Sequence, residues 1–152
     1  MLCLSRALSY VHEPFNPGIW PRWTATPLPH RNLYVCPENE EPYLAAMQAM
    51  VERRLPWRAQ VGEIRTPGDA GRLLKHTAAA TASRTRATPT LIKDPLAVFS
   101  AEWLADRLDL EVVVMVRGPL AFASSIKRLD WAFDFGNWTR QPLLMRDVLG
   151  EL

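Results

Sequence analysis

Five consecutive apolar residues, Val112 to Val116, constrain the fold of this chain more than any other feature. Four of the five are valines, and a β-branched run of this length is typical of a strand that is buried on both faces of a parallel sheet. Gly118 ends the run, and Pro119 suits the first position of a helix, where its missing N–H costs nothing. Arg117 is therefore expected at the carboxyl end of a buried strand, beside a helix N-terminus. Open α/β sheets bind ligands at this edge and helix N-termini favour anions, so the pattern predicts an anion site.

The composition fits one globular domain. The chain has 152 residues, 48% of them hydrophobic, which is enough for a core of ordinary size and unlike a disordered chain. A formal charge of +2 argues against a nucleic-acid partner. Cys3 and Cys36 have no metal-ligand spacing, and two cysteines without a disulfide framework fit a reducing, cytoplasmic location. No apolar run is long enough to span a bilayer, and residues 1–10 lack the pattern of a signal peptide.

Basic residues form two local clusters in the first half of the chain. Runs of charge of this kind are usually exposed, so both clusters are interpreted as solvated helix faces rather than binding sites. The clusters are Arg53, Arg54 and Arg58, and Arg72, Lys75, Arg84 and Arg86.

The second half of the chain predicts a strand–helix–strand–helix order. Residues 90–93 form the first expected strand, Ser100 is the expected N-cap of the following helix, and residues 111–116 form the second strand. This spacing is the size of a right-handed βαβ unit. The next helix is expected over residues 119–129. Four of its side chains are expected to pack on the sheet, namely Phe122, Ala123, Ile126 and Leu129.

The first half carries weaker signals. Tyr10 to Glu13 is expected to form a short strand that Pro14 stops. Residues 14–37 contain six prolines and predict an irregular, proline-rich loop. The remaining expected elements are a helix tail over residues 2–9, a helix from Glu40 to Leu55, a helix from Ala70 to about Ala82, a connector over residues 83–90, and a helix from Gln141 to Leu152.

Arg117 and Ser125 are eight positions apart, and helical geometry places Gly118, Ala121 and Ser125 on one face of the expected helix. A ligand could approach this small face closely, with a bidentate phosphate contact from Arg117 and a hydroxyl donor from Ser125. The alternative is structural. Arg117 would then cap a neighbouring helix, and Ser125 would hydrogen-bond within its own helix.

The stretch from Val113 to Leu129 resembles the 3′-phosphate-binding segment of sulfotransferases that use 3′-phosphoadenosine 5′-phosphosulfate (PAPS). The resemblance implies that Arg117 and Ser125 bind the 3′-phosphate of this cofactor. Leu91 to Ser100 is similar to a strand and helix start of bacterial members, and the likeness extends over nearly the whole chain from Tyr10 onward. It implies a single, partial sulfotransferase domain over residues 1–152, with an incomplete P-loop-NTPase-like parallel sheet and flanking helices. Gly118 departs from the family, in which a polar or larger residue is common.

His12-Glu13-Pro14 resembles the Glu-Pro element of carbohydrate-type sulfotransferases. The likeness implies that Glu13 is the general base for the acceptor hydroxyl, within hydrogen-bond reach of it. Lys93 could neutralise charge on the transferring group. Without the family, Glu13 is interpreted as a strand-end carboxylate in a salt bridge and Lys93 as a solvated lysine near a turn. Asp94 is expected to cap a turn, and Trp20, Trp23 and Trp131 are more often core residues than acceptor platforms.

One departure from the family concerns the cofactor's reactive end. The Ser/Gly/Thr-rich loop that binds the 5′-phosphosulfate is absent from this sequence, and residues 2–9 correspond to the end of the helix that follows it. The domain is therefore expected to be truncated at its N-terminus and also at its C-terminus. Two functions remain open. The first is sulfuryl transfer from PAPS to a carbohydrate, lipid or small-molecule hydroxyl, and the second is an inactive remnant or interaction protein. A kinase-like function lacks its Gly-x-x-x-x-Gly-Lys-Ser/Thr motif, and the oligomeric state stays open.

Overall fold

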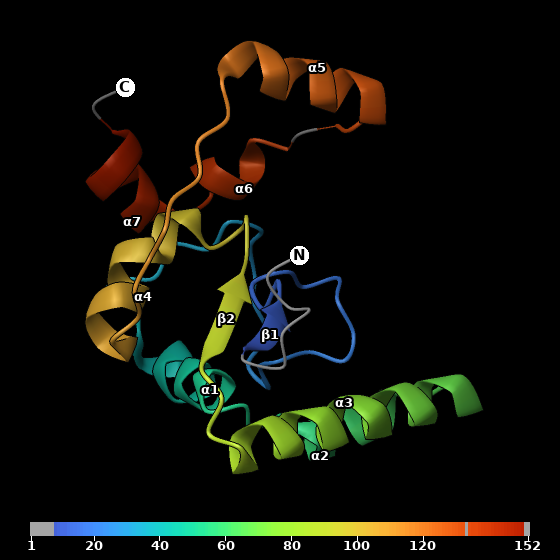
Figure 1. The fold of residues 1–152 in the computed structure, drawn as a ribbon. Helices are drawn as coiled ribbons and strands as arrows, with labels where there is room; N and C mark the ends of the chain where they lie inside the picture. Colours follow the sequence, from blue (N-terminus) through green and yellow to red (C-terminus); the bar gives the residue numbers. More distant parts are fainter. Residues whose placement is uncertain (1–7, 133, 151–152) are drawn as a thin grey trace.

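The computed structural model describes residues 8–132 and 134–150 and has a parallel pair of short strands at its centre (Figure 1). β1 (Ser9–His12) and β2 (Thr90–Lys93) pair in parallel, from Ser9 opposite Thr90 to His12 opposite Lys93. Both expected strands are confirmed, β1 one residue earlier than expected. The α/β class is therefore present as a two-stranded parallel sheet with flanking helices.

The long crossover between the strands contains three helices. They are α1 (Glu41–Val51), α2 (Trp57–Gln60), which continues into the 3₁₀ turn η2 (Val61–Glu63), and α3 (Pro67–Thr85). α3 begins with a capping box, in which the Thr66 hydroxyl accepts from the Asp69 amide and the Asp69 carboxylate accepts from the Thr66 amide. Because α3 extends to Thr85, only the end of the expected connector over residues 83–90 is irregular. α1 ends earlier than expected, since Arg53 adopts a left-handed conformation with φ of 60°.

Residues 14–37 contain no helix or strand, as the prolines indicate. Their apolar side chains nevertheless supply part of the core. The largest buried cluster joins this loop, β1, α1 and α4 (Ala101–Leu108), and α4 follows the 3₁₀ turn η3 (Val98–Ser100). The members of this cluster are Val11, Phe15, Leu33, Val35, Met47, Met50, Ala97, Trp103 and Leu104.

Ser100 precedes α4 as expected, but its side chain does not cap the helix. The hydroxyl is fully buried, donates to the Leu33 carbonyl at 2.6 Å and accepts from the Val35 amide at 2.9 Å. Ser100 therefore fixes the proline-rich loop against the start of α4. The long-range hydrogen bonds displace the local cap that the sequence suggested.

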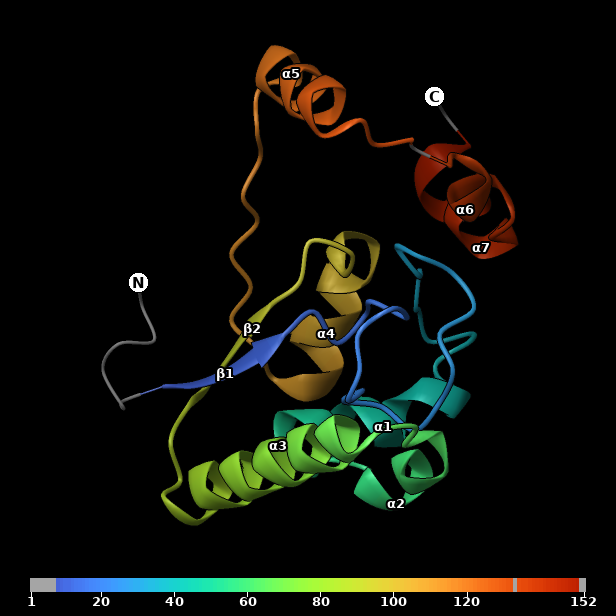
Figure 2. The same cartoon turned by 90° about the vertical axis from the view of Figure 1, so that its right-hand side faces the viewer.

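The expected strand over residues 111–116 does not form. This segment runs as one extended length of chain from α4 to α5 (Pro119–Leu129), without a neighbouring strand among the described residues (Figure 2). Val113 and Val116 are 86% and 89% exposed. A valine run forms a buried strand only where partner strands flank it, and the described residues supply none. The expected βαβ unit is therefore absent.

α5 forms over the expected residues, but it does not pack on the sheet. Figures 1 and 2 both show it apart from the β1–β2 pair, at the far end of the extended segment. Phe122 and Leu129 are each 50% exposed, Ala123 is exposed and Ile126 is only half-buried. The expected packing of these four side chains on the sheet is wrong, because the segment that carries α5 is not part of the sheet.

The C-terminal residues return to the body of the molecule through α6 (Gly136–Thr139), α7 (Pro142–Leu144) and the π-helical turn η4 (Met145–Leu149). Gln141 anchors them, since its Oε1 accepts from the Tyr34 amide at 2.8 Å and its Nε2 donates to the Asn32 carbonyl at 3.1 Å. Leu144 is completely buried. The helical turns start at Pro142, as expected. The helix tail expected before Ser9 falls mainly on residues 1–7, outside the described residues.

Candidate functional site

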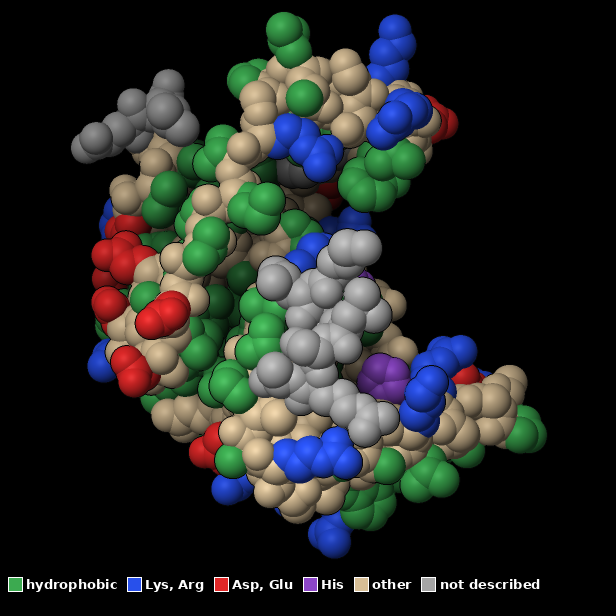
Figure 3. Space-filling view, viewed as in Figure 1, with side chains coloured by type: hydrophobic (Ala, Val, Ile, Leu, Met, Phe, Trp, Pro, Cys, Tyr) green, Lys and Arg blue, Asp and Glu red, His purple; other side chains and the backbone are tan. Residues whose placement is uncertain are grey.

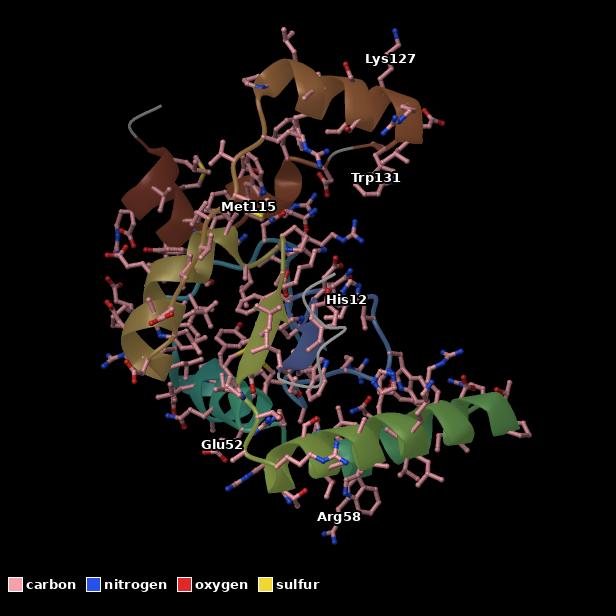
Figure 4. The ribbon with its side chains drawn as sticks, viewed as in Figure 1. His12, Glu52, Arg58, Met115, Lys127 and Trp131 are labelled. Carbon is pink, nitrogen blue, oxygen red and sulfur yellow. The ribbon has the colours of Figure 1, made fainter. Side chains whose placement is uncertain are left out.

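Glu13 and Lys93 meet at the carboxyl ends of the two parallel strands. The Glu13 amide donates to the Lys93 carbonyl at 2.9 Å, which extends the strand pairing by one residue. The Lys93 ammonium donates to Oε1 of Glu13, and Nδ2 of Asn16 donates to Oε2 at 3.0 Å. His12, labelled in Figure 4 at the end of β1, lies with Nε2 3.8 Å from Oε1 of Glu13. The sequence suggested each of Glu13 and Lys93 separately, and the parallel register brings them together.

The environment of Glu13 favours its ionised form. Burial raises the pKa of this carboxyl, but the hydrogen bonds from Lys93 and Asn16 and the positive charge of Lys93 outweigh burial and hold the pKa below its usual range. The Glu13 side chain is 16% exposed and that of Lys93 is 52% exposed. The salt bridge expected for Glu13 from the sequence is present, and it leaves a carboxylate at neutral pH.

The backbone of Glu13 is in the left-handed region, with φ of 44°. This conformation is unfavourable for residues with a side chain other than Asn and Asp, and it persists where surrounding contacts fix it. Here Pro14 follows directly, and the Glu13 carbonyl accepts from the Asn16 amide at 3.0 Å. The turn aims the Glu13 side chain across the strand ends toward Lys93.

Asp94 caps the turn after β2, as expected. Its Oδ1 accepts from the Leu96 amide at 2.8 Å, and its Oδ2 accepts from the Phe15 amide at 2.6 Å. Burial raises the pKa of this carboxyl, and the nearby charge of Glu13 raises it further, against the lowering effect of the two amide donors. Asp94 thus joins the loop after β1 to the loop after β2, next to the Glu13–Lys93 pair.

A cavity of about 160 Å³ opens beside Glu13 in the proline-rich loop. The Arg22 side chain on its rim forms an ion pair with Glu63. The backbone of Arg22 is held by the side chain of Gln60, which is 1% exposed. Gln60 Oε1 accepts from the Arg22 amide at 2.7 Å, and its Nε2 donates to the Arg22 carbonyl at 2.8 Å. The cavity is lined by Glu13, Pro14, Asn16, Pro17, Ile19, Arg22, Trp23, Thr24, Ala25, Thr26, Pro27 and Leu28.

Arg117, just before α5, and Ser125, on α5, also lie together. Nη1 of Arg117 donates to Oγ of Ser125 at 3.1 Å, so the eight-residue spacing brings the two side chains into contact. Gly118 is the N-cap residue of α5, with φ of −56°, and a Cβ there would meet nothing within 4 Å. The surface at Gly118, next to Arg117, is therefore open. The Arg117 side chain is exposed, and Pro119 occupies the first turn of the helix as expected.

The structure forms two separate groups rather than one site. Glu13 and Lys93 form a contact at the carboxyl ends of β1 and β2. Arg117 and Ser125 form a contact at the junction of the extended segment and α5, which lies apart from the two strands (Figure 1). Among the described residues, no hydrogen bond or ion pair links one group to the other.

Two residues of the Glu13 site were not found from the sequence. Asn16 and Gln60 are ordinary polar residues whose importance comes from where the loop folds.

Arg53 also differs from expectation. It is 9% exposed rather than solvated, and its Nη1 donates to Thr88 Oγ1 at 2.9 Å.

The three tryptophans that the sequence suggested as acceptor platforms divide between core and surface. Trp20 and Trp23 pack against a second buried cluster of Leu55, Leu73 and Ala80, and Trp131 after α5 is 67% exposed.

Within residues 8–132 and 134–150, no group of three or more His, Cys, Asp or Glu side chains is arranged to hold a metal ion. In the same residues, no helix is both long and apolar enough to cross a membrane. Cys36 is buried as a free thiol. No family model, curated protein or solved structure matches the chain.

Proposed function

We propose that this chain is a sulfotransferase-family protein that binds the 3′-phosphate end of PAPS at Arg117 and Ser125 and serves sulfuryl transfer to an acceptor hydroxyl. The contact between Nη1 of Arg117 and Oγ of Ser125 carries this proposal. It agrees with the resemblance of residues 113–129 to the family's phosphate-binding segment. The P-loop-like sheet and the cytoplasmic location expected from the sequence belong to the same proposal.

The residues around this contact suit a phosphate. A guanidinium presents a planar fork of donors that matches phosphate oxygens, and Arg117 uses one nitrogen for Ser125. The first amides of α5 have no acceptor within the helix, and they add partial positive charge beside Arg117. A phosphate can approach closely because no side chain stands at Gly118.

Glu13 and Lys93 are proposed to act at the acceptor. The bound nucleotide would supply the sulfuryl group and would leave as adenosine 3′,5′-bisphosphate. Glu13 is ionised at neutral pH and would accept the proton of the acceptor hydroxyl on Oε1 or Oε2. Its low pKa makes it a weak base while Lys93 is bound. A hydroxyl that displaces the Lys93 ammonium from Glu13 would free the carboxylate and leave Lys93 to stabilise negative charge nearby.

The cavity beside Glu13 is the proposed acceptor pocket. A volume of about 160 Å³ is smaller than a drug-sized pocket, and cavities of about 150 Å³ hold a single benzene ring. The acceptor group that enters it is therefore one ring, such as a single sugar or a small phenol. Trp23, Pro27 and Leu28 provide an apolar wall, and Asn16 and Thr24 provide polar groups.

A calorimetric titration with adenosine 3′,5′-bisphosphate tests this proposal. We expect binding by the wild-type chain and a loss of about 1.5–3 kcal/mol in Arg117→Ala, the value of a hydrogen bond to a charged group. Arg128→Ala on the same helix is the matched control, and it should bind nearly as well as the wild type. Equal affinities of Arg117→Ala and the wild type would remove the site assignment.

One observation favours the alternative function of an interaction protein. Residues 112–116 are apolar and exposed, as expected of a surface that binds another chain. Incubation with radiolabelled PAPS and a panel of sugar and phenol acceptors separates the two functions. Turnover by the wild-type chain that is lost in Glu13→Gln supports the enzyme. A wild-type chain that binds the bisphosphate but shows no turnover supports the interaction protein.

A further inference from the structure

The segment from Glu111 to Arg117 is an extended stretch of chain that pairs with no strand among the described residues. No backbone N–H or C=O of these residues hydrogen-bonds to another described residue. Val113, Met115 and Val116 are 86%, 92% and 89% exposed. Figure 3 shows hydrophobic side chains along this segment, and Figure 4 labels Met115 within it. Proteins usually protect such a stretch with charges, prolines or a cover, and no residue between 112 and 116 does so.

The segment is chemically self-complementary. It reads Glu-Val-Val-Val-Met-Val-Arg, with one acidic residue at the start, one basic residue at the end and five apolar residues between them. Antiparallel pairing with a second copy, centred on Val114, places Glu111 opposite Arg117 of the other copy. Val112 then lies opposite Val116, Val113 opposite Met115, and Val114 opposite itself. Opposite charges and β-branched pairs in facing positions both stabilise antiparallel strands.

Other registers lose this match. Parallel in-register pairing places Glu111 beside Glu111 and Arg117 beside Arg117, which is unfavourable. An antiparallel shift by two residues in one direction sets Glu111 opposite Met115, and in the other direction it sets Arg117 opposite Val113, so the pairing of Glu111 with Arg117 is lost in both. In the centred register, side chains alternate between faces, so one face holds three valine pairs and the other holds Val113–Met115 pairs between two ion pairs.

We propose that two copies of this chain associate through residues 111–117, as a two-fold symmetric antiparallel β-ribbon centred on Val114. A two-fold interface uses the same surface on both copies, which the reversed charges at the two ends of this segment satisfy. The apolar surface continues onto α5, where Leu120 is 86% and Phe122 is 50% exposed. In the dimer, Arg117 exchanges its contact with Ser125 for Glu111 of the second copy, so pairing and anion binding compete for one guanidinium.

Analytical ultracentrifugation of the full chain over a range of concentrations tests the proposal, by comparing the wild type with variants in which the charge at position 111 or 117 is reversed. The wild type should dimerise, and Glu111→Arg and Arg117→Glu should each weaken the dimer by about tenfold or more, because each sets like charges opposite each other twice. An equimolar mixture of the two variants restores both ion pairs and should form a heterodimer. These side chains are exposed, so circular dichroism of each variant should match the wild type. A wild-type chain that stays monomeric, or a mixture that does not associate, overturns the proposal.

Cysteine cross-linking tests the register independently of affinity. In a Cys3→Ser chain, with Cys36 buried, Val114→Cys should cross-link two copies under mild oxidation, because facing Cα atoms in antiparallel strands lie at about 4.5–5.5 Å. Val112→Cys is the matched control, and it should not cross-link, since it faces Val116 rather than its own copy. Equal cross-linking of the two variants would contradict the register.

Discussion

Lys93 and Glu13 are 80 positions apart in the sequence and form an ion pair across the carboxyl ends of β1 and β2. The pair exists because the parallel register sets His12 opposite Lys93, and Glu13 follows His12 in a left-handed turn. The contact gives Glu13 a carboxylate at neutral pH and an adjacent cation. Glu13 also lines the proposed acceptor cavity, so the ion pair connects this cavity to β2.

Replacing Lys93 should change the pH dependence of stability. The folded-state pKa of Glu13 is lowered below that of the unfolded chain, so its contribution to stability is fully present above the unfolded-state pKa and is lost as the pH falls through the folded-state pKa. We expect Lys93→Met to lower the free energy of unfolding by about 0.5 kcal/mol at neutral pH, since Lys93 is half exposed. Urea unfolding should show the difference disappearing in acid. Lys127→Met, on the surface of α5, should show no such pH dependence.

The positive φ of Glu13 can be tested by comparing the stability of alanine and glycine variants at this position. Glu13→Ala and Glu13→Gly remove the same ion pair, but glycine adopts the left-handed conformation without a steric penalty. Glu13→Gly should therefore be more stable than Glu13→Ala by about 1 kcal/mol. The order should reverse at His12, a strand residue without positive φ, and thermal unfolding of the four variants measures both differences. A more stable Glu13→Ala would rule out the left-handed turn.

Removal of the Asp94 carboxylate should destabilise the loops after both strands. Asp94→Ala leaves the amides of Phe15 and Leu96 without their acceptor, which we expect to cost about 2 kcal/mol or more. Asp94→Asn keeps one oxygen acceptor and should lose less. Chemical denaturation gives the ranking, and hydrogen exchange at the Phe15 amide should accelerate in both variants. Unchanged exchange at this amide would contradict the cap.

Gly118 offers a gain of stability. Its N-cap position has a β-region backbone and makes no side-chain cap, and a Cβ there meets nothing within 4 Å. Gly118→Ser should stabilise α5 by a few tenths of a kcal/mol. Gly118→Asp should cap the helix equally well but repel an anion at Arg117. Circular dichroism and bisphosphate titration of both variants separate the two effects, and undiminished anion binding by Gly118→Asp would argue against a phosphate beside Arg117.

Local signals were sufficient for most elements of this fold. The prolines at positions 14 and 119 each act within a few residues, and β1, β2, α1, α3, α4 and α5 all form near their expected places. The contact between Arg117 and Ser125 is likewise local, because Arg117 directly precedes α5 and Ser125 lies on it.

Features that depend on distant chain were harder to predict. The valine run 112–116 has the composition of a buried strand, but whether a strand forms depends on its neighbours, and those are set by the topology rather than by the run. Ser100 binds Leu33 and Val35 instead of capping α4, and Gln60 holds Arg22, because the proline-rich loop folds over them. No local pattern marks such partners. The pairing of Glu13 with Lys93 similarly required the register of β1 and β2.

The assignment of Arg117 to a nucleotide 3′-phosphate is tested most directly by comparing two ligands on two proteins. Adenosine 3′,5′-bisphosphate and adenosine 5′-monophosphate differ only in the 3′-phosphate. We expect the wild type to prefer the bisphosphate by about 1.5–3 kcal/mol and Arg117→Ala to bind both ligands equally, when all four affinities are measured by calorimetry. A wild-type chain that binds the two nucleotides equally, or a preference that survives in Arg117→Ala, would contradict this account.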